Sequence, residues 1–344
     1  MNQNLLLFDS FDACLGPGES RFFGSGYTRV SQHLDHIVSY GSTAPGAEIH
    51  AWATLDYPRD WSRKSAAPQL RPHVSSIDVL LLAVTLCEVH LSTAHGLTPD
   101  QLGRAWLRSA DVRAGSRPHE TLSDFPVRGR LADSRPAPDG EPGPLHSTYD
   151  CRVGGLRARC VLVHERGART GGDRPDAHVF GSVTDVLGPA GSRVYGAAHK
   201  AHRHVAGDVA VDLTHRRVRA RQRLVRRADA PPVRHGLEAA YAPSVTVVDG
   251  LVGAAQLAQA LLYAQDGLDR AGSNTLWMRR MTIGTDTPVR PVDGPFDVRA
   301  RATHNRLLSW DGGLWRTTDC AVDDFRGIHG SFSVAHRLPA HRAA

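Results

Sequence analysis

The chain has 344 residues, of which 41% are hydrophobic and 22% charged, and these are proportions of a globular protein long enough for two domains. Five cysteines without framework or metal-ligand spacing argue against a disulfide scaffold or a zinc site and indicate reduced thiols in a cytoplasmic protein, while a net charge of +6 permits an anionic partner. We expect neither a signal peptide, since the basic start and apolar core are missing, nor a run near the roughly 18 apolar residues of a membrane span.

The first domain is expected to span residues 1–164. Gly24 and Gly26 follow a Gly-Pro-Gly turn and mark a place where the backbone can approach another group closely, so Gly24 and nearby Tyr27 are candidate binding residues. Strand-like patterns are found at 27–40 and 48–56, where apolar and polar residues alternate.

A long buried helix follows, because residues 79–91 are apolar nearly all round. Ser75 or Ser76 can cap its start, Asp78 lies in the first turn, and Gly96 gives the expected stop signal. Further strands are predicted at 105–112 and 125–131, and a hairpin turn at Gly154. Residues 165–190 are expected to link this domain to a second one at 191–344.

The second domain repeats the first. Pro72-His-Val-Ser-Ser-Ile-Asp78 recurs as Pro243-Ser-Val-Thr-Val-Val-Asp249, and at this offset of 171 residues 15 of the 59 positions from 72 to 130 are identical. A repeat at a fixed offset indicates a duplicated domain. The second helix is expected at 251–262 with Gly267 after it, and strands at 276–283 and 296–303.

A hairpin at Gly312 is matched to the one at Gly154, an offset of only 158. This match predicts about 13 extra residues in the first copy, at the Pro/Gly-rich segment 134–144. Each half thus has strands, one buried helix and three or four antiparallel strands. One buried helix needs a sheet that curls around it, so the predicted class is α+β, a tandem hot-dog. Another α+β topology could share this element order.

The chain resembles the avirulence protein D (AvrD) family over most of its length, and three segments carry the resemblance. They are Leu15-Gly-Pro-Gly-Glu-Ser-Arg-Phe-Phe-Gly-Ser-Gly-Tyr27, Tyr57-Pro-Arg-Asp-Trp61 and Val74-Ser-Ser-Ile-Asp78. The resemblance implies an enzyme that makes syringolide-like acyl sugars from a β-ketoacyl chain and a five-carbon ketose. It also implies an analogy with A-factor-type butyrolactone synthases, which are tandem hot-dog proteins.

Asp78 and Asp249 occupy equivalent positions at the starts of the two helices. Each could merely stabilise its helix by interacting with the dipole, worth roughly 0.3–1 kcal/mol. Alternatively, one of them acts as a general base beside free backbone N–H groups that bind a thioester oxygen as charge develops. Duplication copies structural and functional residues alike, so the repeat leaves both interpretations open.

The two helices differ at three positions. Glu88 aligns with Gln259, Thr85 with Gln256, and His90 with Leu261. Glu88 and His90 need partners if they are buried, and the simpler alternative places them near the helix end in contact with solvent. Gln256 and Gln259 lie on alanine-rich turns that suit ligand binding. This asymmetry favours one working site, around Asp249, Gln256 and Gln259, with Asp78 and Glu88 as further catalytic candidates.

Arg108 and Arg279 follow Trp106 and Trp277 on predicted strands, and they either face solvent or bind phosphate or phosphopantetheine. Four arginines alternate with other residues over 217–223, which indicates a basic strand face that is most simply solvated. The histidine cluster at 199–204 has no carboxylate or cysteine partner nearby in sequence, so no metal site is expected there.

The leading hypothesis is a cytoplasmic acyltransferase that needs no cofactor and joins a β-ketoacyl thioester to a small ketose, free or phosphorylated. Its partners would be acyl carrier protein or coenzyme A thioesters and the sugar, with no nucleic acid and no membrane. The alternatives are a non-catalytic binder of an acyl or butyrolactone ligand and a dehydratase- or thioesterase-like hot-dog enzyme. The usual dehydratase His and Asp spacings are missing from the sequence. Whether the protein is a monomer or a homodimer stays open.

Overall fold

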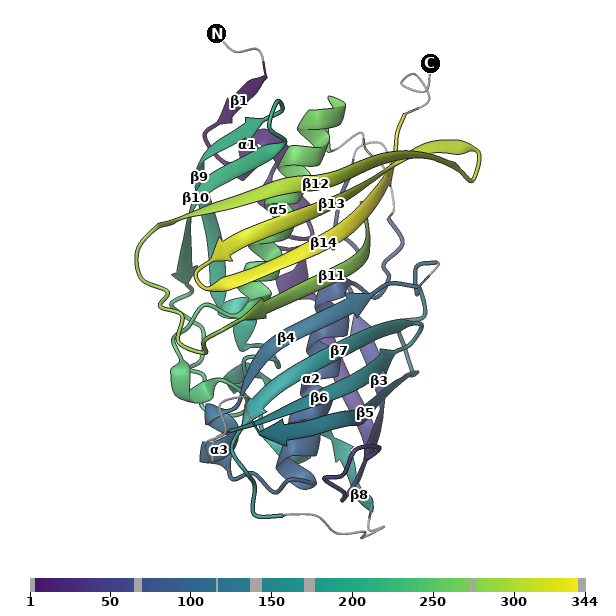
Figure 1. The fold of residues 1–344 in the computed structure, drawn as a ribbon, viewed down its shortest axis with the longest axis vertical. Coiled ribbons are helices and arrows are strands. Elements are labelled where there is room, and N and C mark those ends of the chain that lie inside the picture. The colour runs from purple at the N-terminus through teal and green to yellow at the C-terminus, as the bar shows by residue number, and fades with distance from the viewer. Residues whose placement is uncertain are drawn as a thin grey trace.

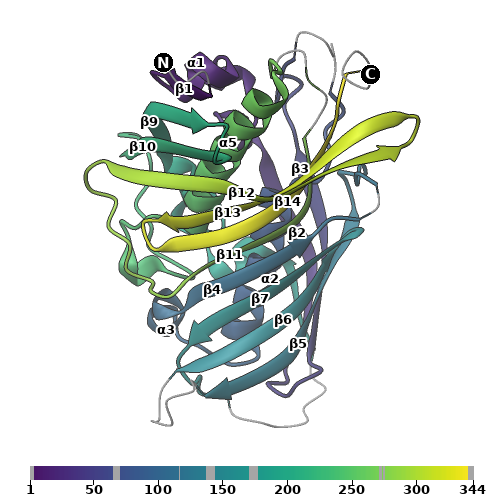
Figure 2. The same cartoon turned by 45° about the horizontal axis from the view of Figure 1, so that its top comes forward.

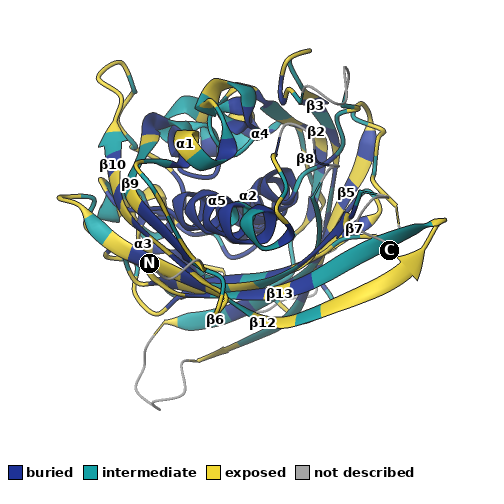
Figure 3. Cartoon of the chain, turned by 90° about the horizontal axis from the view of Figure 1, so that it is seen from above, coloured by how far each residue is buried: buried dark blue, intermediate teal, exposed yellow. Residues whose placement is uncertain are grey.

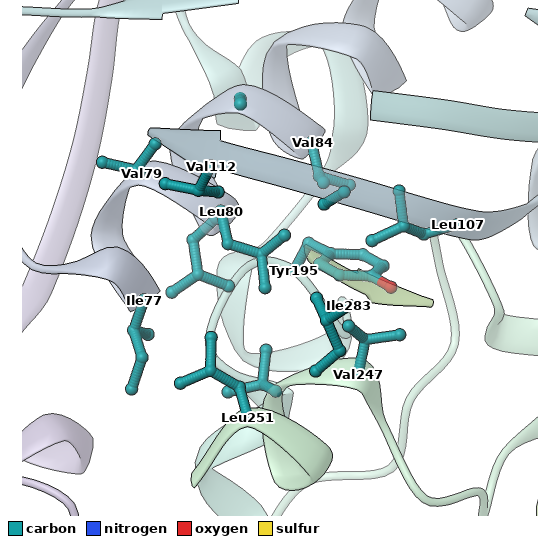
Figure 4. Packing of buried hydrophobic residues seen from close by; sticks show 14 of the residues in the cluster. Ile77, Val79, Leu80, Val84, Leu107, Val112, Tyr195, Val247, Leu251 and Ile283 are labelled. Carbon is teal, nitrogen blue, oxygen red and sulfur yellow. The ribbon is translucent and has the colours of Figure 1, made fainter. Parts of the chain in front are cut away.

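A computed structural model describes residues 4–64, 70–115, 117–136, 144–169, 177–270, 273 and 276–339. One strongly curved antiparallel sheet encloses two long helices, α2 (Ser76–Thr93) and α5 (Val247–Asp266), as Figures 1 and 3 show. Buried apolar residues of both halves form one continuous core. In Figure 4 the first turns of the two helices meet, with Ile77 of α2 near Leu251 of α5. The α+β class is therefore confirmed.

In the described residues the strands form a single 14-stranded sheet, ordered β1-β9-β10-β12-β13-β14-β11-β4-β7-β6-β5-β3-β2-β8. Their bounds are β1 Leu5–Phe8, β2 Ser31–Tyr40, β3 Glu48–Asp56, β4 Trp106–Arg113, β5 Phe125–Pro136, β6 Leu145–Val153, β7 Leu156–His164, β8 Ala177–Ser182, β9 His202–Asp212, β10 Arg217–Arg226, β11 Trp277–Thr285, β12 Phe296–Trp310, β13 Gly313–Phe325 and β14 Ile328–Arg337.

The two halves of the sheet join where β4 pairs with β11, with Arg113 opposite Arg280. Moving outward from this junction, β7, β6, β5, β3, β2 and β8 follow on one side, and β14, β13, β12, β10, β9 and β1 on the other. Each strand thus has one counterpart in the other half. The fold has the internal symmetry that the repeat predicts.

This symmetry corrects the predicted match between the hairpins. Gly154 lies in the turn between β6 and β7, whose counterpart is the turn between β13 and β14 at Gly327, whereas Gly312 lies between β12 and β13. The prediction of 13 extra residues is therefore wrong, because two glycine turns of different hairpins were matched. The segment 134–144, of which 137–143 lie outside the described residues, connects β5 to β6.

The first elements of each half cross to the other half. β1 pairs with β9, and the short helix α1 (Phe11–Leu15) packs on α5. Conversely, β8 pairs with β2, and α4 (Val183–Leu187) packs on α2. Each crossing strand covers backbone groups of β2 or β9 that would otherwise form an open sheet edge. The expected linker therefore contains β8 and α4, while the domain limits stay predictions.

Both predicted helices are confirmed, together with their caps. Ser75 and Thr246 accept hydrogen bonds from the N–H groups of Asp78 and Asp249, and each aspartate bonds back to the cap residue, which forms two capping boxes. Gly267 ends α5 in the left-handed conformation. Contrary to the sequence-based expectation, both helices are long and apolar enough to cross a membrane by length and composition. In the fold, however, 89% of the residues of each apolar segment, Ser76–Thr93 and Val247–Gln265, are buried inside the protein, as in the core helix of a globular domain.

Candidate functional site

A cavity of about 500 Å³ lies alongside α5. Its lining on α5 extends from Gly250 to Tyr263, which corresponds to roughly 20 Å at 1.5 Å per residue. The facing wall is apolar and comes mainly from β11, β13 and β14, with Met281, Ile283 and Phe325 among its residues. The cavity suits an elongated apolar ligand.

Small side chains on α5 make room for this cavity. Gly250, Ala255 and Ala258 line it. At the repeat offset of 171, their counterparts on α2 are the larger Val79, Val84 and Cys87, read from the sequence. The helix is otherwise similar in both halves, so these positions help to explain why α5 has open space beside it.

The equivalent space beside α2 is filled by a buried polar network. The segment Ser20-Arg-Phe-Phe-Gly24 matches Ser192-Arg-Val-Tyr-Gly196, so Tyr195 is the counterpart of the cavity-lining Phe23. The Tyr195 hydroxyl donates to Glu238 Oε1 at 2.6 Å. Glu238 also pairs with Arg290 at 2.5 Å, and Arg193 pairs with Glu88 at 3.4 Å. Among the described residues, the cavity of about 500 Å³ thus lies beside α5, whereas the network leaves a cavity of only about 30 Å³ next to Glu238. The two halves differ, and which of them is the working site stays a prediction.

The cavity reaches the N-terminus of α2, where Ser75 and Ser76 line it. N–H groups in the first turn of a helix lack partners within the helix and carry partial positive charge. Directly behind them lies Asp78, 1% exposed, whose Oδ2 accepts a hydrogen bond from Ser75 Oγ at 2.7 Å. This end of the cavity offers hydrogen-bond donors and a nearby carboxylate.

Two side chains that the sequence analysis did not single out hold the Asp78 carboxylate. Gln32 Nε2 donates to Oδ1 at 2.9 Å, and the Tyr57 hydroxyl donates to Oδ2. Burial, and then the Asp78 charge, raises the pKa of Tyr57 well above its usual range, so the phenol keeps its proton and remains a donor. Tyr57 lies in Tyr57-Pro-Arg-Asp-Trp61, a segment that carries the family resemblance, and this was the feature of the sequence that could have identified it as a site residue.

Basic side chains also line the cavity, including Lys64, His73, Arg117 and Arg270. Burial, followed by the charge of Arg270, lowers the pKa of Lys64 to about 8. Its Nζ donates to the carbonyl and hydroxyl oxygens of Ser273 at 3.2 Å. The cavity therefore combines apolar walls with cations suited to an anionic group.

Asp249 lies in a different environment, against β9. Its Oδ2 is 2.9 Å from His202 Nδ1, and its Oδ1 is 3.4 Å from His204 Nε2, although that second contact lacks hydrogen-bond alignment. Burial alone would raise the pKa of Asp249, but the charges and contacts of the two histidines lower it overall. The same carboxylate raises the pKa of His202 against the effect of burial.

The histidine cluster therefore has the carboxylate partner that its sequence neighbourhood did not offer. Asp249 is 47 residues from His202, and the fold alone brings them together. Among the residues that the structure describes, no group of three or more histidine, cysteine or acidic residues is placed to hold a metal ion.

Of the other candidates, Gln259 and Trp277 line the cavity. Gln256 is buried and accepts a hydrogen bond from Arg21 at 2.8 Å. Tyr27 is buried near Asp249, whose charge, after burial itself, raises the pKa of the phenol. Gly24 does mark a close approach, but to its own loop: a Cβ there would lie 2.2 Å from Gly18 O.

Glu88 and His90 do not reach solvent, which contradicts the simpler alternative, because both are 0% exposed in the core. Glu88 accepts from Leu237 N at 2.9 Å in addition to pairing with Arg193. His90 Nδ1 lies 3.0 Å from the Tyr149 hydroxyl. Both residues belong to the packed half, away from the cavity beside α5.

The paired arginines are on the surface. Arg108 is 41% exposed and pairs with Asp286 at 3.2 Å, and Arg279 is exposed. The four arginines of β10 also alternate outward, as expected, over buried Val218, Ala220 and Gln222. These residues therefore fit the solvated-face interpretation.

The fold and the cavity define a duplicated α+β protein with a largely apolar cavity between a long helix and a curved sheet. The family model described as "Pseudomonas avirulence D protein (AvrD)" matches residues 6–339, and the chain belongs to this family. No curated protein shows a significant match to the sequence.

Solved structures similar to this chain include the tesB protein of Mycobacterium avium subs paratuberculosis, with 10% identity, a TM-score of 0.38, and coverage of 85% of this chain and 93% of that one. A protein from Lactobacillus plantarum described as an oleoyl thioesterase has 13% identity and a TM-score of 0.40, with coverage of 86% and 98%. An acyl-CoA thioesterase II, TesB2, from Mycobacterium marinum has 12% identity and a TM-score of 0.34, with coverage of 76% and 92%.

Proposed function

We propose that this protein is a tandem hot-dog enzyme that transfers a β-ketoacyl group from a thioester to a hydroxyl of a small ketose or ketose phosphate. One observation carries the proposal: an apolar cavity roughly 20 Å long beside α5 reaches the N-terminus of α2. The cavity walls suit an acyl chain, and the first-turn N–H groups suit a carbonyl oxygen that gains negative charge. Membership of the AvrD family supports this reaction class.

The chemistry balances without a further reagent. The acceptor hydroxyl oxygen forms a bond to the thioester carbonyl carbon, the carbon–sulfur bond breaks, and the thiol leaves with the hydroxyl proton. The carbon between the two carbonyls of the new ester then attacks the ketose carbonyl within the same molecule, and this carbon–carbon bond closes a five-membered lactone ring. The hydroxyl formed from the ketose carbonyl then leaves as water with the remaining proton of the attacking carbon, which creates the double bond of a butenolide-like product. The thiol would be that of coenzyme A or of a carrier protein.

Asp78 is the proposed base, acting through Ser75. The Ser75 hydroxyl lines the cavity and donates to the Asp78 carboxylate at 2.7 Å, so a proton from the acceptor can pass inward and return to the leaving sulfur. This differs from the sequence-based preference for Asp249, whose carboxylate is already paired with His202 on the β9 side of α5.

The test is mass spectrometry of the purified protein incubated with β-ketoacyl thioesters and a panel of three- to five-carbon ketoses and their phosphates. A new mass equal to acyl group plus sugar, with one free thiol per product, is expected. Asp78→Asn should slow formation of this product about 100-fold or more, whereas Arg108→Ala on the surface should not change its rate. Free acid and thiol without a sugar ester would instead indicate a thioesterase, and bound but intact thioester would indicate a ligand-binding protein.

A further inference from the structure

Three tryptophan side chains line the cavity together: Trp277 on β11, and Trp310 and Trp315 on the β12–β13 hairpin. The rings of Trp277 and Trp310 are 6.4 Å apart between centroids, and those of Trp310 and Trp315 are 5.0 Å apart. These three residues, the tryptophan wall, form one continuous aromatic surface. Such rings present large rigid apolar areas to a ligand.

The tryptophan wall lies at the opposite end of the cavity from the N-terminus of α2. Ile283 of β11 lies beside Val247, in the first turn of α5, in Figure 4. Trp277 lies six residues earlier on the same strand, which at about 3.4 Å per residue places it roughly 20 Å away. An acyl chain whose thioester group is at Ser75 would therefore have its far end at the tryptophan wall.

The hairpin that carries two of these tryptophans has longer strands than the described part of its counterpart. β12 and β13 have 15 and 13 residues, against 12 and 9 in their counterparts β5 and β6, and the hairpin projects beyond the neighbouring strands in Figure 2. Trp310 is 53% exposed, so its ring separates the cavity from solvent.

We propose that the tryptophan wall sets the longest acyl chain that the cavity accepts. This inference rests on the proposed function, which places the reacting carbonyl at the N-terminus of α2. A chain that fits within the cavity buries each methylene group against apolar walls. A longer chain must displace the ring of Trp310 or Trp315, and it loses the burial that those rings provide.

The test uses unreactive thioether analogues of acyl thioesters in a series of chain lengths, with binding measured by calorimetry. In the native protein, affinity should rise with chain length and then stop rising. Trp310→Ala and Trp315→Ala should move this limit to longer chains, with roughly tenfold tighter binding for two additional buried methylene groups. Trp310→Phe, which keeps an aromatic wall, should keep the native limit.

Leu307→Ala is the matched control, since Leu307 is on the same hairpin, is 51% exposed, and points to the face opposite Leu308 and Trp310. It should leave the limit unchanged. If both tryptophan variants remain folded and keep the native limit, the inference is wrong. Because binding is measured without turnover, a wild-type protein that binds the series but makes no sugar ester would overturn the proposed reaction and leave this inference to be judged on the binding data.

Discussion

Asp78 and Asp249 cap equivalent helices but have different neighbours, so their substitution should have different effects. Asp78→Asn removes the proposed base and should lower kcat about 100-fold or more, with little change in KM. Asp249→Asn leaves His202 without its counter-charge in a buried site and should instead cost roughly 3 kcal/mol of the free energy of unfolding. Steady-state kinetics and urea unfolding of both variants check this pair of outcomes.

The reverse result, a stable Asp78→Asn with full kcat and an inactive but stable Asp249→Asn, would return the catalytic role to Asp249. It would also mean that the cavity reaches the Asp249 carboxylate when ligand is bound.

Glu88 is fully buried in the packed half, and its removal should destabilise the protein strongly. Glu88→Ala leaves the Arg193 guanidinium buried without its carboxylate, for an expected loss of about 3–5 kcal/mol in urea unfolding. Glu165→Ala, which breaks the exposed pair with Arg104 at 2.6 Å, is the matched control and should cost less than about 1 kcal/mol. Equal losses for the two variants would contradict the structural role assigned to Glu88.

Individual site residues were only partly predictable from the sequence. The equivalence of the two aspartates followed from the repeat. Gln259 and Trp277 line the cavity, while their role in ligand binding stays a prediction. His202, Gln32 and Tyr57 were missed, because each meets its aspartate only after the chain has folded over 21 to 47 residues. A periodic pattern reports local structure, and it carries no information on such contacts.

Among the elements, the helices were predicted best. Their apolar runs and N-terminal cap residues are local signals that both α2 and α5 have. Gly267 caps α5 directly, whereas α2 ends at Thr93 with Ala94 as its cap, and Gly96 turns left-handed two residues later. The strand patterns were also local. The match between hairpins of the two halves does not follow from local sequence. The glycine turns at Gly154 and Gly312 look alike, although the first joins β6 to β7 and the second joins β12 to β13. Only the symmetric strand order distinguishes them.

The small side chains of α5 lead to a prediction at the level of this helix. Ala255→Val introduces the residue that α2 has at the equivalent position, Val84, and fills part of the cavity. It should change the free energy of unfolding by less than about 1 kcal/mol while weakening the binding of acyl thioether analogues at least about tenfold. Calorimetry and urea unfolding measure the two quantities.

Val84→Ala is the reciprocal variant. It should destabilise the packed half without creating a second binding site, because Tyr195 and the Glu238–Arg290 pair still fill that space. Unchanged acyl binding by Ala255→Val would show that the ligand lies elsewhere.

At the scale of the whole molecule, three buried histidines should make stability depend on pH. Burial lowers the pKa of His90 and of His164 to about 4, and burial together with the charges of those two residues lowers that of His95 to about 3. In the unfolded chain these histidines are expected to have the ordinary histidine pKa of about 6.5. As the pH falls from about 6.5 towards 4, the unfolded state takes up more protons, and stability is lost by at most about 1.4 kcal/mol per pH unit for each histidine.

His90→Leu introduces the residue that the second half has at this position, Leu261. It should reduce the dependence of the unfolding free energy on pH by at most about 1.4 kcal/mol per pH unit, the contribution of one histidine. Urea unfolding between about pH 7 and about pH 5 measures it. His202 contributes in the opposite direction, because its raised pKa keeps its stabilisation at low pH and loses it as the pH rises. An unchanged slope in His90→Leu would show that His90 is not among the groups responsible.

The crossing of β1 and β8 was beyond sequence analysis, since pairing such as Leu5 with Asp212 joins opposite parts of the chain. It has an evolutionary consequence. Two identical chains that exchanged their first strands in this way would have built two identical cavities, and any mutation would have altered both. Joining the two copies in one gene made the positions independent. Selection could then fill the space beside α2 with Tyr195 and the Glu238–Arg290 ion pair while the cavity beside α5 stayed open, so that two halves of common origin could take on separate tasks.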